Sequence, residues 1–317
     1  MTTTTTIALR TPRNKRTSLL RALLHDPRAL TGGSMLLLAV IAATVGPMLS
    51  PYGATATDVD TGLAAPDAAH WFGTDSFGRD VLTRLLTGLG YSLVIGASVA
   101  LAAALLGVTI GLIAAYYSKT DTLLMRICDG FLAFPDILLA LAVVAALGPS
   151  LPNLIACITV VFVPQMARLV RSTALVSKEL PYVEALKSVG AGGPRIIIKH
   201  ILPNSASTIL AQISIFFAVA IVIETALSFL GAGIPAPTPS IGNMIADGKL
   251  YVYSGWWMIA FPAAALAWGV LAVTLLGDAL RDQVDPTTRT SGRGGIAAVF
   301  AAGARLFARN GDSRAQR

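Results

Sequence analysis

Six long apolar runs constrain the fold of this chain more than any other feature of its sequence, since each has roughly 17 to 26 residues. An α-helix rises about 1.5 Å per residue, so about 20 apolar residues cross a bilayer core of roughly 30 Å. The composition agrees, because 54% of the 317 residues are hydrophobic and only 13% are charged, too little charge to cover a soluble domain. The sequence therefore predicts an all-α integral membrane protein with six transmembrane helices.

The predicted spans differ in regularity. Gly107 and Gly111 in the second span form a G-x-x-x-G pattern, which predicts close packing with another helix. Pro164 predicts a kink in the fourth span. Some thirty polar residues precede the centre of the first span, which favours a retained anchor over a cleaved signal peptide. The spans cover about residues 30–49, 92–117, 131–147, 151–170, 205–230 and 256–276.

Basic residues are distributed unevenly between the two sides of these spans. If the N-terminus is cytoplasmic, the outside segments contain only Arg79, Arg84 and Lys249. This is the positive-inside pattern, and it predicts that both termini and the loop 178–204 are cytoplasmic. It also accounts for the net charge of +7 without a nucleic-acid partner, which would need a soluble basic fold.

The loop 178–204 is polar and lies between two predicted spans. Pro181 and Pro194 each suit the first turn of a helix, and the glycine-rich stretch 190–193 would separate two short helices. Neither helix is long enough to cross a membrane. The loop is therefore predicted to be a docking element, with an amphipathic loop on lipid headgroups as the alternative.

The first of these short helices carries a narrow apolar stripe. Val183, Leu186 and Gly190 fall at helical spacing, while Glu184 and Lys187 lie off the stripe. A stripe of this kind can enter a groove on a partner protein.

The same loop resembles the cytoplasmic coupling loop, or EAA motif, of ABC-importer permeases. The family pattern is Glu-Ala-Ala, a Gly four residues later and a closing Leu-Pro, and Leu186 is the one departure, because a small residue is usual there. The resemblance implies an ATPase-coupling role for Tyr182, Glu184, Ala185, Leu186, Lys187, Gly190, Ala191, Leu202 and Pro203.

A second segment is similar to the Gly-Thr-Asp-x-x-Gly-Arg-Asp signature of the second permease in peptide, nickel and related importers, the DppC and OppC type. Its Asp80 and Arg84 are expected to pair at i,i+4 on an amphipathic helix, in a structural rather than chemical role. The resemblance covers nearly all of residues 30–286. The signature residues are Gly73, Thr74, Asp75, Gly78, Arg79 and Asp80.

The resemblance implies a type I ABC-importer permease fold, with one extra N-terminal helix before a five-helix core. The implied parts are a basic cytoplasmic tail (1–28), the first transmembrane helix (29–50), an extracytoplasmic segment with an amphipathic helix (51–90), the permease core (91–281) with coupling loop 178–204, and a cytoplasmic tail (282–317).

The resemblance also implies partners and a location. It places the chain in the bacterial cytoplasmic membrane, among lipid, as one half of a heterodimer with a homologous second permease. Two ABC ATPase subunits or one fused ATPase, and an extracytoplasmic solute-binding protein, complete the importer. The solute is expected to be a di- or oligopeptide, with nickel, metallophore chelates, glutathione and haem left open.

Nucleotide and metal sites are not expected in this chain. No G-x-x-x-x-G-K-S/T run occurs, so ATP and Mg²⁺ are expected on partner subunits and the chain itself is not expected to be an enzyme. Cys128 and Cys157 lie in or next to apolar runs, which predicts packed thiols rather than a disulfide.

Glu224 is the best candidate for an ion-coupling residue. An acidic side chain inside a transmembrane helix carries a high free-energy cost unless it is paired or reached by water. An ion-coupled secondary transporter using Glu224 is the alternative function, although broken helices and internal repeats are not evident in the sequence. In a purely structural interpretation, Glu224 reaches water near the outer interface or hydrogen-bonds a neighbouring helix. Together with Ser228, Gly231 and Gly233 it forms the candidate pathway or structural set, before a Pro- and Gly-rich loop expected to cap the outer mouth.

Overall fold

The computed structural model describes residues 24–284, so most of the two predicted tails lies outside the described residues. Within this range the chain is helical and contains no strand. The main helices are α2 (Pro27–Leu49), α3 (Val81–Tyr116), α4 (Ser118–Leu132), α5 (Asp136–Leu147), α6 (Leu151–Lys178), α7 (Pro181–Ser188), α8 (Gly193–Ile196), α9 (Leu202–Phe229), α10 (Ile241–Gly248) and α11 (Trp257–Val284).

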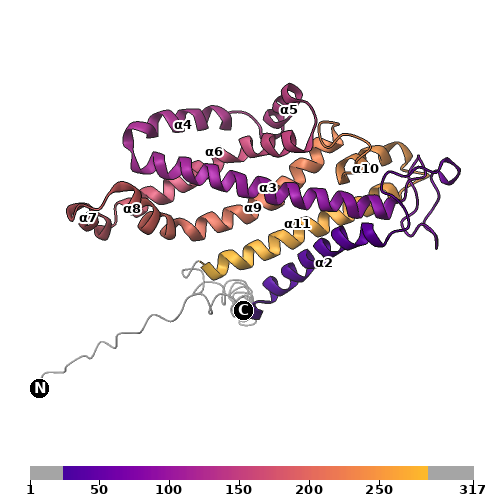
Figure 1. The fold of residues 1–317 in the computed structure, drawn as a ribbon, viewed down its shortest axis with the longest axis horizontal. Coiled ribbons are helices and arrows are strands. Elements are labelled where there is room, and N and C mark those ends of the chain that lie inside the picture. Colours follow the sequence, from indigo (N-terminus) through magenta and orange to yellow (C-terminus); the bar gives the residue numbers. More distant parts are fainter. Residues whose placement is uncertain (1–23, 285–317) are drawn as a thin grey trace, which may run out of the picture.

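The long helices α2, α3, α6, α9 and α11 run side by side, as Figure 1 shows. The short helices α7 and α8 lie at one end of this bundle, which we call the α7 end. The segment 51–80, with its short helix η1 (Val59–Thr61), lies with α10 at the other, the α10 end.

Five of these helices are long and apolar enough to cross a membrane, and the bent pair of α4 and α5 makes a sixth crossing if it is counted as one span. The chain returns through this pair from the α7 end, where α3 stops, to the start of α6 (Figure 1). The predicted continuous third span, 131–147, is wrong in shape, because the helix breaks with a bend of 93°. Phe134 precedes Pro135, and a residue before proline is disfavoured in helical conformation.

Helix α3 begins earlier than predicted. Its 36 residues start at Val81, not at residue 92, and span about 54 Å. The amphipathic helix expected in the segment 51–90 is therefore the first turns of α3. Its apolar residues Val81, Leu85 and Leu89 are buried against the protein itself.

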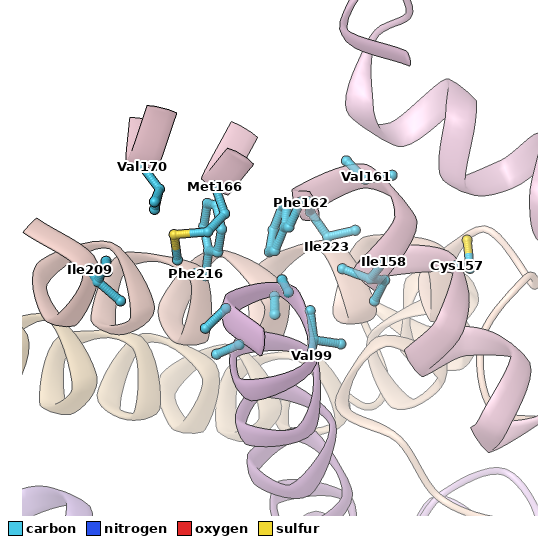
Figure 2. Close-up of a cluster of buried hydrophobic side chains, with 14 of the residues drawn as sticks. Val99, Cys157, Ile158, Val161, Phe162, Met166, Val170, Ile209, Phe216 and Ile223 are labelled. Atoms are coloured by element: carbon cyan, nitrogen blue, oxygen red, sulfur yellow. The ribbon is translucent and has the colours of Figure 1, made fainter. Parts of the chain in front are cut away.

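The main core lies between α3, α6 and α9. Figure 2 shows Phe162 and Met166 of α6 meeting Phe216 of α9, and the rings of Phe162 and Phe216 stack with centroids 4.4 Å apart. A Cβ on Gly107 would lie 2.5 Å from the Cβ of Met166, so only glycine lets α3 approach α6 here. The close packing predicted from the G-x-x-x-G pattern is therefore a contact inside the chain.

Candidate functional site

Helix α7 is anchored to the bundle by two residues of its predicted apolar stripe, Val183 and Leu186. Val183 is fully buried, and Leu186 is half-buried against the main core. Val183 and Leu186 are therefore not available to a partner's groove, whereas Gly190, the third residue of the stripe, is exposed. A helix of eight residues is too short to be stable alone, so it must bury one face against its own protein.

The rest of the α7 surface is not covered by the described part of the chain. Tyr182, Glu184, Ala185 and Lys187 are all exposed. Just beyond the helix, Val189 is 80% exposed.

Gly190 ends α7 through its backbone conformation. Its φ is +82°, in the left-handed region, and its N–H donates to Lys187 O at 3.0 Å while Ala191 N donates to Leu186 O at 3.0 Å. These two bonds form a Schellman motif, which favours glycine at this position. No atom lies within 4 Å of where a Cβ would be, so the glycine is needed for conformation rather than for packing inside the chain.

The second half of the loop runs directly into α9. Pro194 lies in the first turn of α8, as predicted, but α8 continues through a π-helical turn, η2 (Ile197–Ile201). Leu202 donates to Ile197 O, five residues back, and Pro203 has no N–H to continue the α-helical ladder. Asn204 then donates to Tyr182 Oη at 2.7 Å, which ties the base of α9 to α7.

At the α10 end, the carboxylate of Asp75 organises the signature segment. It accepts from the backbone N–H groups of Phe77 at 2.9 Å and Arg79 at 3.0 Å, and from Arg79 Nε at 2.6 Å. Arg84 lies 3.4 Å from the same carboxylate and donates to Ala54 O at 3.0 Å. Asp75, Arg79 and Arg84 are all buried.

Asp80 has a different partner from the one predicted. Its Oδ2 accepts from Thr83 N at 2.8 Å, which caps α3, and its Oδ1 lies 2.9 Å from His70 Nδ1. The predicted Asp80–Arg84 pair is wrong, because an N-cap carboxylate turns toward the backbone of the first turn. Arg84 pairs with Asp75 instead.

The remaining signature residues shape the backbone. Thr74 is fully buried, and its carbonyl accepts from Trp257 Nε1 at 3.0 Å. Gly73 and Gly78 have φ of +73° and +69°. A Cβ on Gly78 would overlap the carbonyl oxygen of Asp58. These contacts fit the predicted structural role.

Asp247 links this cluster to α10. Its carboxylate lies 3.8 Å from Arg79 Nη2 and its side chain is half exposed. Burial raises the pKa of Asp247, while the neighbouring Arg79 and Arg84 guanidinium groups oppose that rise.

Glu224 is fully buried in α9 and is held by hydroxyl groups. Ser92 of α3 and Ser228 of α9 each donate to it at 2.8 Å. It therefore hydrogen-bonds a neighbouring helix, as one part of the purely structural interpretation of Glu224 predicted. Gly231, with φ of +82°, ends α9, and a Cβ on Gly233 would overlap Ser228 Oγ. Glu224, Ser228 and Gly233 pack inside the chain, whereas Gly231 is exposed.

One polar cluster was not predicted from the sequence. Arg171 donates to both oxygens of Asp121, at 2.5 and 2.6 Å, Arg168 pairs with Asp129, and Gln165 donates to Asp136 at 3.2 and 3.3 Å. These three side-chain pairs join α6 to α4 and α5. The signal in the sequence was the i,i+3 spacing of three polar residues on α6. We call this set the α4–α6 polar row: Asp121, Asp129, Asp136, Gln165, Arg168 and Arg171.

Two family models match the chain. The model described as binding-protein-dependent transport system inner membrane component matches residues 107–290. The model described as the N-terminal TM domain of oligopeptide transport permease C matches residues 17–66.

Curated relatives match over most of their length. A putative peptide transport system permease protein of Brucella suis biovar 1 is 45% identical over 258 residues, 81% of this chain and 87% of the relative. The dipeptide transport system permease protein DppC of Alkalihalophilus pseudofirmus is 42% identical, covering 79% and 83%. The glutathione transport system permease protein GsiD of Pectobacterium atrosepticum is 39% identical, covering 85% and 90%.

A solved structure of the MetNI methionine ABC transporter in inward facing conformations is similar in fold. The TM-score is 0.52 at 20% sequence identity, over 63% of this chain and 96% of the matched chain. The similarity shows the fold alone, that of a type I ABC-importer permease.

Proposed function

Because the chain belongs to the family of binding-protein-dependent transport system inner membrane components, we propose that it forms half of the translocation pathway of an ATP-driven peptide importer. In this proposal, ATP and Mg²⁺ bind to separate ABC ATPase subunits, or to one fused ATPase. The other half of the pathway is a homologous second permease.

The observation that carries the proposal is the outward face of α7. Val183 and Leu186 hold the helix on the bundle, and Tyr182, Glu184 and Val189 remain exposed. Helix α6 reaches α7 after a link of only two residues, so a displacement of α7 is passed to a long helix of the core. ATPase subunits that close on nucleotide would thus move the transmembrane helices through α7.

The basic residues support an orientation with the α7 end in the cytoplasm. The α7 end carries Lys119, Lys178, Lys187, Arg195 and Lys199. The α10 end carries only Arg79, Arg84 and Lys249 among the described residues, and the first two of these are buried. In this orientation both termini lie in the cytoplasm. The chain itself spans the bacterial cytoplasmic membrane. The α10 end faces outward and is the surface for a solute-binding protein.

The names of the relatives favour a peptide as the solute. They are named for peptides, a dipeptide and glutathione, which is itself a tripeptide. We therefore favour peptides over nickel, metallophore chelates and haem.

The geometry of Glu224 does not favour the ion-coupled alternative. Its side chain is fully buried and accepts from two hydroxyl groups at 2.8 Å, so it has no exposed face on which to exchange an ion. The network instead holds α9 against α3.

Uptake by the reconstituted transporter tests the proposal. We expect import of a labelled dipeptide to require ATP and to survive dissipation of the proton gradient, and the isolated chain to bind no nucleotide. Import that survives ATP depletion but stops when the proton gradient is dissipated would contradict the proposal.

A further inference from the structure

We propose that Arg168 of α6 and Asp129 of α4 contact the solute in the translocation pathway, and that they take the carboxylate and the ammonium group of a zwitterionic solute such as a short peptide. This inference rests on the proposed function, because it assigns a solute-contacting pair to the same importer.

Exposure distinguishes this pair from its neighbour in the α4–α6 polar row. The side chains of Arg168 and Asp129 are 56% and 57% exposed, whereas those of Arg171 and Asp121 are 31% and 25% exposed. Arg171 also holds Asp121 through two hydrogen bonds. The Arg171–Asp121 pair therefore joins α6 to α4, while the side chains of Arg168 and Asp129 remain about half exposed.

The pair lies within the length of the bundle. Arg168 is ten residues before Lys178, the last residue of α6, or about 15 Å along the helix. Lys178 donates to the last carbonyls of α3, at Ala115 and Tyr116, so both helices end at this level. Lipid solvates an ion pair poorly at such depth, and exposed ionisable groups there face water or a protein partner.

The surroundings fit a peptide. Met125 and Leu132 lie four residues before and three residues after Asp129, on the same face of α4, and both are half-buried. Cys128 is the only residue of α4 that is buried. A guanidinium binds a carboxylate through two parallel hydrogen bonds, and a carboxylate accepts from an ammonium group. A zwitterion can thus exchange one ion pair for two, without a net change in charge, while its side chains contact the apolar residues.

A structural clamp is the competing explanation, and a crossed design separates the two. Uptake of alanyl-alanine, its C-terminal amide and its N-acetyl derivative is measured with the complete transporter. If Arg168 contacts the carboxylate, Arg168→Gln should lower the ratio of free-peptide uptake to amide uptake about two- to fivefold. Its preference over the acetylated peptide should persist.

Asp129→Asn should show the reverse pattern. The same binding protein delivers the solute in every arm, so its own preference cancels in the ratio between variant and wild type. Arg171→Gln is the matched control, since it removes the same group one turn away and should change neither ratio. Equal loss of all three solutes in Arg168→Gln and Asp129→Asn would overturn the proposal in favour of a clamp.

A second readout does not depend on the solute. In a chain with Cys128 and Cys157 replaced by alanine, Arg168→Cys should react with a membrane-impermeant thiol reagent in the assembled transporter. Leu105→Cys, on the exposed side of α3, should not react. An unreactive position 168 would overturn the proposal, whereas failure of the wild type to import any peptide would instead refute the proposed function.

Discussion

The two ends of the bundle use their sequence motifs in opposite ways. At the α10 end, Asp75 and Asp80 direct their carboxylates to partners within the chain. At the α7 end, only the inner face of α7 is covered, and Glu184 and Val189 are exposed. Two motifs that look equally specific in the sequence thus differ, since one is used up in contacts within its own fold and the other stays partly exposed, where we propose that the ATPase binds.

Two glycines show the same contrast. Gly78 and Gly190 both have positive φ. A Cβ on Gly78 would overlap Asp58 O, whereas a Cβ on Gly190 would meet no atom within 4 Å. Substitutions at the α10 end should therefore affect folding, and substitutions at the α7 end should affect coupling.

The largest expected effect is the loss of the buried Asp75 charge. Asp75→Asn leaves the buried Arg84 guanidinium without its carboxylate, and removing one partner of a buried ion pair costs about 3–5 kcal/mol. Thermal unfolding of the purified chain would measure this, with the exposed Asp60→Asn as the control. An unchanged melting temperature would show that the cluster is not structural.

Gly78→Ala should have the next largest effect. The methyl group meets a backbone oxygen and the residue must keep φ of +69°, so we expect a loss of about 2–4 kcal/mol in stability. Gly53→Ala, in the same segment, meets nothing closer than 3.4 Å and serves as the control. Equal stability of the two variants would contradict the packing described at Gly78.

Gly190→Ala should affect function more than folding, the opposite of what we expect for Gly78→Ala. Left-handed backbone costs a non-glycine residue about 1–2 kcal/mol, and here the cost falls on the end of α7. We expect nearly unchanged thermal stability but about a 5- to 30-fold weaker ATPase affinity. Gly192→Ala, with φ of −67° and open space around it, is the matched control. A melting temperature lowered as far as by Gly78→Ala would erase the contrast between the ends.

The smallest effect is a pH dependence at Asp247. Because burial raises the pKa of Asp247 in the folded chain, the folded state holds this proton more tightly than the unfolded state. Its contribution is fully present below the unfolded pKa of about 3.9 and is lost as the pH rises through the folded value. Asp247→Asn should thus gain melting temperature relative to wild type between about pH 4 and pH 7. A relative loss would mean that attraction to Arg79 dominates.

Local patterns in the sequence predicted much of the fold. Hydropathy predicted the spans within α2, α6, α9 and α11, and Pro181 with Gly190 predicted the bounds of α7. These features depend on residues close together in the chain. The Phe134–Pro135 break was a local signal too, but the apolar residues on both sides of Pro135 and Asp136 masked it.

Features that depend on distant residues were not predicted. The inward turn of Val183 depends on a core built by α3, α6 and α9. The pairing of Asp75 with Arg84 depends on Asp80 being used as a helix cap. Neither follows from spacing, because an amphipathic stripe does not identify the surface that it covers.

The central claim is that the outward face of α7 contacts the ATPase, and crosslinking from position 189 tests it most directly. A photoreactive residue in place of Val189 should crosslink to the ATPase subunit in the assembled transporter. The same group should not do so in place of Val183, which is buried, or of Phe77, which is exposed at the α10 end. Crosslinks from position 77, or none from position 189 in a transporter that still imports solute, would contradict the account.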